Sequence, residues 1–233
     1  GDSSYAVLEL LHFCQSLTHP VTFVTRLRLD AALYAPATPR QPGQRGRPRL
    51  KGARLPTLQQ RLQCSDTPWT RVIVPWYDGT QRLLEIISHT AVWYHSGLPP
   101  VPLRWVLIRD PLGEFRPQAL LGTNLEVTGT QIIEWFVLRW RLEVTFQEAR
   151  AHLGIETQRQ WSDLAIARTT PILFGLFSWV TLAAHVLKAG NTIPSRATAW
   201  YPKPLPTFSD AIALVRQRLW YPSDSFPMSP SPP

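Results

Sequence analysis

Cysteine is nearly absent from the sequence, and this limits the kinds of site that the chain can form. The 233 residues include 2 cysteines, Cys14 and Cys64, and no CxxC pair. Structural zinc sites and the disulfide frameworks of secreted domains both need more cysteines at closer spacings. We therefore expect neither of them, and we expect a reduced, cytoplasmic setting.

Acidic residues are also scarce. The chain has 16 Asp and Glu against 24 Lys and Arg, which gives a net charge of +8 and a pI near 10.1. This balance favours a polyanionic partner, with nucleic acid first and an anionic membrane surface second. Apolar residues make up 44% of the chain, enough for the core of one domain or of a domain with an insertion.

Charged residues are missing altogether between residues 169 and 187, a run at the lower edge of the length that spans a membrane. Its apolar character is interrupted by Pro171, Ser178, Thr181 and His185. We therefore expect a core helix packed under a sheet and no membrane partner. The alternative is a basic protein that associates with membranes through this segment.

The sequence does contain a long helical segment at residues 130–153, TQIIEWFVLRWRLEVTFQEARAHL. It has no Gly or Pro, which predicts an unbroken helix of about six turns. Apolar side chains cover most of its circumference, which predicts burial. Arg139 and Glu143 lie on one stripe, and burying their charges is costly unless they are paired or meet a ligand. One interpretation is an i,i+4 salt bridge worth about 0.3 to 0.5 kcal/mol, and the other is a ligand site.

The second interpretation follows from the spacing of Phe136, Arg139, Glu143 and Arg150. The pattern resembles the signature of a large group of DDE transposases from bacterial insertion sequences, which has tyrosine, arginine, glutamate and lysine at these places. Arg139 and Glu143 match strictly, whereas Phe136 lacks the phenol hydroxyl and Arg150 keeps only the charge of lysine. The resemblance implies that Glu143 is a catalytic, metal-binding carboxylate and that Arg139 and Arg150 bind phosphate.

Residues 1–29 carry a second part of the resemblance. Asp2 and the serines after it precede an apolar-periodic segment, which predicts a capped helix as far as Leu17, and residues 21–29 alternate as a strand does. The side chains predicted to face inward are Val7, Leu10, Leu11 and Cys14. This order resembles the segment after the second catalytic aspartate of the same transposases, and the resemblance implies that Asp2 is a catalytic, metal-binding residue. A simple helix cap is the alternative.

Residues 36–58 form a basic stretch without one acid. Arginine and lysine alternate there with Pro and Gly, so the stretch cannot bury a core and is expected to be a mobile loop. One interpretation is an arm that contacts DNA phosphates, and the other is a solvated linker. The residues proposed for phosphate contact are Arg45, Arg47, Arg49, Lys51 and Arg54.

Residues 69–128 are rich in β-formers. Two hairpins are predicted, one turning at Asp78-Gly79 and one at Asp110 to Gly113, and these turns explain both aspartates without catalysis. The aromatic side chains favour core packing, with stacking on bases as the alternative. The resembling transposases carry a β-rich insertion at this point in the chain.

The C-terminal part reads as helices and a tail. Gly154 is expected to end the central helix and Ser162 to cap the next one, and residues 207–220 predict an amphipathic helix capped by Ser209 or Asp210. The Pro-rich tail at residues 221–233 is expected to be disordered.

The resemblance implies an α/β, ribonuclease H-like fold that is incomplete at the N-terminus. Its expected parts are a core segment at 1–35, the basic loop at 36–68, the β-rich insertion at 69–128, C-terminal core helices at 129–220 and the tail at 221–233. Three carboxylates of such enzymes hold two Mg²⁺ or Mn²⁺ ions, which activate water or a DNA 3′-hydroxyl and stabilise the leaving oxygen.

The first of the three carboxylates, an aspartate, has no counterpart, because only Gly1 precedes Asp2. We therefore expect the C-terminal portion of a bacterial DDE transposase, catalytically incomplete by itself and acting in DNA transposition. Its expected partners are transposon-end and target DNA, with a homodimer or an upstream transposase fragment. The alternative function is that of a non-catalytic DNA-binding or dimerising remnant that competes with an intact enzyme.

Overall fold

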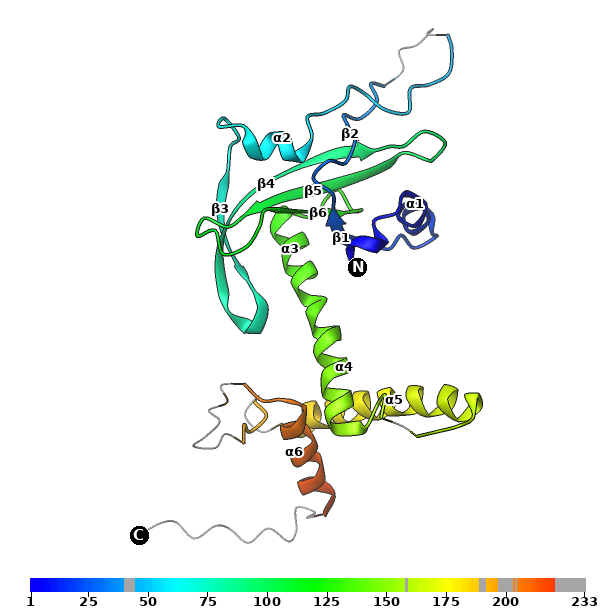
Figure 1. Ribbon diagram of the computed structural model, residues 1–233, viewed down its shortest axis with the longest axis vertical. Helices are drawn as coiled ribbons and strands as arrows, with labels where there is room; N and C mark the ends of the chain where they lie inside the picture. Colours follow the sequence, from blue (N-terminus) through cyan, green and yellow to red (C-terminus); the bar gives the residue numbers. More distant parts are fainter. Residues whose placement is uncertain (40–44, 158, 189–191, 197–202, 204, 221–233) are drawn as a thin grey trace. The chain divides into compact units, whose positions relative to one another are not determined.

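The computed structural model describes residues 1–39, 45–157, 159–188, 192–196, 203 and 205–220. The chain divides into two compact units, Gly1–Trp140 and Arg141–Pro233 (Figure 1). The first unit combines an antiparallel sheet with helices and the second is helical, so the expectation of a mixed α/β protein is confirmed. The boundary between the units falls within the predicted central helix.

The sheet of the first unit has the strand order β1-β6-β5-β4-β2, and β3 pairs with β4. Every pairing in the described part of the chain is antiparallel. The strands are β1 Val24–Leu27, β2 Leu33–Tyr34, β3 Thr70–Pro75, β4 Gln81–Trp93, β5 Val101–Arg109 and β6 Gln118–Gly122. The segment predicted as an insertion therefore shares one sheet with the N-terminal strand β1.

Both predicted hairpins are present. A short 3-10 helix, Tyr77–Gly79, joins β3 to β4, and the loop that begins at Asp110 joins β5 to β6. The carboxylate of Asp110 is buried and accepts hydrogen bonds from the backbone N–H groups of Leu112 and Glu114 and from Arg82. This confirms a turn role for Asp110.

Helices cover both faces of the sheet (Figure 1). Helices α1 Leu8–Ser16 and α2 Leu58–Gln63 pack through Leu8, Leu11 and Leu58 on the face that carries Trp105. Helix α3 Gly129–Leu138 packs through Ile132, Ile133 and Phe136 on the opposite face. Alternate residues of each strand serve the two cores, as the pleat requires.

The N-terminal helix is shorter than predicted. Asp2 caps a 3-10 helix, Ser3–Tyr5, and the α-helix begins only at Leu8 after Val7. Leu11 and Cys14 are buried as expected, whereas Val7 is exposed and Leu8 takes the inward position. The cap motif thus stabilises a single turn rather than the helix that follows.

The predicted unbroken central helix is wrong. Helix α3 is followed by a second helix, α4 Trp140–Leu153, with Arg139 between the two. Thr128 and Gln131 form a capping box at the start of α3, and a Cβ on Gly129 would lie 2.9 Å from the Cβ of Ser88, so this end is pressed against β4. Of the residues in α4, only Ala149 is buried, so the predicted burial holds for α3 alone.

The predicted mobile loop is also partly wrong, because its C-terminal third is bound to β2. Gly52 donates to the carbonyl of Ala35, Ala35 donates to that of Ala53, and Leu55 donates to that of Leu33. Helix α2 follows directly, with Thr57 as its cap. Residues 40–44 of the basic stretch lie outside the described part.

The second unit contains α5 Asp163–Leu187 and α6 Phe208–Trp220. Gly154, with φ +72°, follows α4, and Ser162 caps α5, both as predicted. Phe177 of α5 stacks on Phe208 of α6 at 4.2 Å between ring centroids. The predicted tail at residues 221–233 lies outside the described part of the chain.

The prediction that residues 169–187 form a buried core helix is wrong. Of the residues of α5, only Ala184 is buried, and the side chains of Ile172, Trp179 and Val186 are exposed. Among the described helices, α5 is the one long and apolar enough to cross a membrane, a criterion of length and composition that core helices and signal sequences also meet.

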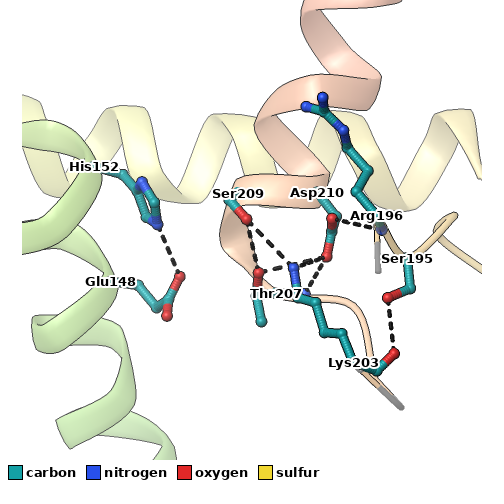
Figure 2. A network of polar contacts seen from close by, with 8 residues as sticks. All are labelled: Glu148, His152, Ser195, Arg196, Lys203, Thr207, Ser209 and Asp210. Atoms are coloured by element: carbon teal, nitrogen blue, oxygen red, sulfur yellow. Dashed lines mark hydrogen bonds and ion pairs between the residues drawn. The ribbon is translucent and has the colours of Figure 1, made fainter. Parts of the chain in front are cut away.

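Asp210 organises the start of α6 (Figure 2). Its buried carboxylate accepts hydrogen bonds from the backbone N–H groups of Arg196 and Thr207 and from the ammonium of Lys203 at 2.5 Å. Asp210 therefore lies within the first turn of α6 and holds the preceding loop, instead of capping the helix from outside as predicted.

This network predicts acid sensitivity of the second unit. Burial by itself would raise the pKa of Asp210, but the hydrogen bonds from Lys203, Thr207 and Arg196 outweigh it and lower the pKa below its ordinary 3.8. The stabilisation is therefore complete above about pH 4 and is lost as the pH falls through the lowered folded-state pKa. We expect Asp210→Asn to lower stability at neutral pH and to flatten its acid dependence. Circular dichroism melts between pH 2 and pH 7 measure this, and an unchanged acid limb would contradict it.

Candidate nucleic-acid interface

Asp2 lies at the edge of the sheet, on the N-terminal segment that runs beside β1. Its carboxylate accepts a hydrogen bond from the backbone N–H of Ser3 at 2.6 Å. Its backbone carbonyl accepts one from the hydroxyl of Thr25 on β1, also at 2.6 Å. The side chain itself is exposed, so the backbone fixes the residue while the carboxylate faces solvent.

Two arginines act electrostatically on this carboxylate. The hydrogen bond from Ser3 is the main cause that lowers the pKa of Asp2; burial opposes it, and the positive charges of Arg139 and Arg26 lower the pKa further. Asp2 is therefore ionised at neutral pH. Folding thus brings the arginine of the C-terminal motif to the acid at the start of the chain.

Phe136 joins the two arginines. Its ring is buried, and the guanidinium carbons of Arg26 and Arg139 each lie 5.6 Å from the ring centroid. Cations at this distance from an aromatic face are attracted to it. The position that holds tyrosine in the resembling signature serves here as a platform between two cationic side chains.

Sequence reasoning missed Arg26. The residue alternates with buried Thr25 and Leu27 on β1, which is the edge strand of the sheet, so its side chain is exposed on the face that α3 covers. The alternation of side chains along the predicted strand indicates which face of the sheet Arg26 occupies. Its nearness to Phe136 depends on how α3 packs, which no local pattern shows.

Glu143 and Arg150 belong to the second unit, on α4. Glu143 is partly buried. The guanidinium of Arg150 forms an exposed ion pair with Glu156, with 2.6 Å between Nε and Oε2. A phosphate would have to compete with Glu156 for Arg150. The motif is thus divided, with Phe136 and Arg139 in the first unit and Glu143 and Arg150 in the second.

The basic stretch separates into residues that face solvent and one that is held. Arg45, Arg47, Arg49 and Arg54 are exposed. Lys51 is different, because its ammonium lies 3.6 Å from the ring centroid of Tyr34 and 4.4 Å from that of Tyr94. Its interaction with Tyr34 also lowers the pKa of that phenol. Two tyrosine rings therefore hold Lys51, and its phosphate contact stays a prediction.

Metal ligation requires several oxygen donors at one place. In the described ranges, no group of three or more His, Cys, Asp and Glu side chains is arranged to hold a metal ion. Of the two residues proposed as metal ligands, Asp2 offers an exposed, ionised carboxylate of the kind that Mg²⁺ prefers, and Glu143 is partly buried. Asp110 and Asp210 are occupied by the hydrogen bonds described above.

Comparison with models of protein families gave no match for this chain. Comparison with curated proteins also gave no match.

Proposed function

We propose that this chain is part of a DDE-type transposase with a ribonuclease H-like fold, which acts on DNA by metal-dependent phosphoryl transfer. One observation carries the proposal: the guanidinium carbons of Arg139, the arginine of the motif, and of Arg26 each lie 5.6 Å from the ring centroid of Phe136. Arg26 follows Thr25 on β1, whose hydroxyl donates a hydrogen bond to the backbone carbonyl of Asp2. The chain order also supports it, because a β-rich segment lies between β1 and the motif helices as in the resembling transposases.

The chemistry assigned to each residue follows from charge. Asp2 and Glu143 would serve as two of the carboxylates that hold Mg²⁺ or Mn²⁺, and a further carboxylate would complete the set. When bound, the metal supplies Lewis acidity at the scissile phosphate and lowers the pKa of water. Arg139 and Arg26 would neutralise the phosphate charge from the side of Phe136. DNA is the substrate implied by the resembling transposases, and the net charge of +8 favours binding of its phosphodiesters.

A second candidate function is non-catalytic DNA binding by a transposase remnant. Two observations favour it, namely that no three potential ligands are grouped in the described residues and that Glu156 occupies Arg150. This function predicts salt-dependent binding of duplex DNA that is insensitive to Glu143→Ala. It also predicts competition with an intact enzyme for the same DNA ends.

Metal binding tests the proposed role of Asp2. We expect Mn²⁺, followed by electron paramagnetic resonance in the presence of duplex DNA, to bind more weakly to Asp2→Asn and to Glu143→Gln than to the unchanged chain. Asp30→Asn is the matched control. Asp30 is an exposed acid just after β1, and it forms an ion pair with Arg28. Equal losses in Asp2→Asn and Asp30→Asn would exclude a specific metal-binding role for Asp2.

Cleavage assays test the two functions against each other. We expect residues 1–233 alone to bind a nicking substrate in Mg²⁺ without cutting it, since only two of the three implied carboxylates are assigned. Cleavage that Glu143→Ala abolishes would show that the chain assembles a complete site. Absence of DNA binding at low salt would refute both functions.

A further inference from the structure

The second unit contains a cationic cavity of about 400 Å³ that the transposase signature does not involve. Residues of α6 line most of it, together with Arg196 and with His152 near the end of α4. Its size is within the range of small-ligand pockets. The lining residues that matter for binding are His152, Arg196, Ser209, Arg216, Gln217 and Trp220.

The charge of this cavity is one-sided. None of its lining residues in the described part is acidic, and in those residues neither Arg196 nor Arg216 forms an ion pair. Asp210 lines the adjoining cavity and is held by Lys203 and by backbone N–H groups, and the carboxylate of Glu148 lies 3.5 Å from Nε2 of the lining residue His152. Figure 2 shows the guanidinium of Arg196 extending away from this Asp210–Lys203 pair. Two guanidinium groups are thus left available to an anion.

The lining also offers an aromatic surface. The guanidinium carbon of Arg216 lies 4.5 Å from the ring centroid of Trp220, and the indole is exposed. A planar guanidinium beside an indole provides a charged group for a phosphate and a flat face for a base. Gln217 adds an amide to the lining, and the hydroxyl of Ser209 is shared with that of Thr207 at 2.9 Å.

We propose that this cavity binds a nucleotide unit, with its phosphate at Arg196 and Arg216 and its base against Trp220. The site would be a second contact for a nucleic acid strand, separate from Asp2, Arg26 and Arg139. This inference rests on the proposed function only in that DNA is taken as the nucleic acid that supplies the nucleotide. Nucleotide binding here does not require metal or the carboxylates of Asp2 and Glu143.

Isothermal titration of the full chain with deoxyadenosine 5′-monophosphate, inorganic phosphate and deoxyadenosine tests the site. We expect the nucleotide to bind more tightly than either fragment. Arg216→Gln is expected to weaken nucleotide binding about fivefold or more, because a charged hydrogen-bond donor is lost. Arg218→Gln is the matched control, since Arg218 is an exposed arginine of the same helix that does not line the cavity.

Trp220→Ala separates the two halves of the proposal. It is expected to weaken binding of the nucleotide and to leave binding of inorganic phosphate unchanged. Equal effects of Arg216→Gln and Arg218→Gln, or no nucleotide binding by the unchanged chain, would overturn the site. Because these probes contain no metal and no duplex, a failure here leaves the results of the Mn²⁺ and cleavage tests standing, and the reverse also holds.

Discussion

Replacing Arg139 with glutamine should weaken binding of duplex DNA by about five- to tenfold at moderate salt and reduce the salt slope by about one unit. Arg139 lies over the ring of Phe136, and its charge acts on the carboxylate of Asp2. A phosphate bound near Asp2 would therefore lose a favourable charge in the variant. Fluorescence anisotropy with a labelled duplex at several salt concentrations measures both quantities. The effect on affinity should be smaller at high salt, because counterion release drives the contact.

Arg28→Gln is the control that makes this result specific. Arg28 follows β1 directly and is exposed, but it forms an ion pair with Asp30 at 2.6 Å. The substitution Arg28→Gln removes one positive charge, as Arg139→Gln does, so an effect of net charge alone would appear in both variants. An equal loss of affinity in the two variants would show that Arg139 has no special role. Arg26→Gln should weaken DNA binding as much as Arg139→Gln does if the two arginines beside Phe136 contact the same phosphate.

The largest expected effect on stability comes from Trp105→Ala. The side chain is 1% exposed and fills the core between the sheet and the helices α1 and α2. Truncating a buried tryptophan costs about 3 to 5 kcal/mol through lost burial and the cavity left behind. Urea unfolding followed by far-ultraviolet circular dichroism measures the change, with two transitions allowed for the two units.

Trp161→Ala is the matched control for that experiment. Trp161 is 99% exposed and belongs to the second unit. The same truncation there should change the free energy of unfolding by less than about 0.5 kcal/mol. A cost at Trp105 as small as the one expected at Trp161 would show that the packing around Trp105 contributes little to stability. DNA affinity at temperatures where Trp105→Ala is folded should remain unchanged.

Local patterns predicted the elements whose signals are contained in a few residues. The turns at Gly79 and Gly113 need residues that accept positive φ, and both hairpins were found there. Gly154, which has positive φ, marked the end of one helix, and Ser162, whose side chain caps the next helix, marked its start. These predictions succeeded because the cause of the structure lies within the segment itself.

Tertiary contacts decided the rest. Nothing in residues 130–153 marks a break, yet the helix is interrupted at Arg139, where the part packed on the sheet gives way to α4. The pairing of β1 with β6 joins two parts that the sequence presented as separate, and the pairing of β4 with β5 joins the two predicted hairpins. Periodicity indicates which side of an element is apolar, but it does not show what that side packs against.

The same limit applies to the site. The spacing of the motif identified Arg139, and the cap position identified Asp2, but only the packing of α3 beside β1 relates them. Lys51 shows the opposite case. The composition of residues 36–58 suggested a solvent-facing cation there, but two tyrosine rings hold its ammonium. Charge can be counted from a sequence, whereas its availability depends on the neighbours that folding provides.

The backbone bonds between Ala35 and Gly52 have a consequence for how the basic stretch can evolve. They clamp both ends of the intervening segment at one point, so the segment behaves as a closed loop. Closing such a loop costs only about 0.6 kcal/mol more for each doubling of its length. Insertions or deletions between these residues should therefore change how far Arg45, Arg47 and Arg49 reach, with little effect on the sheet that anchors them.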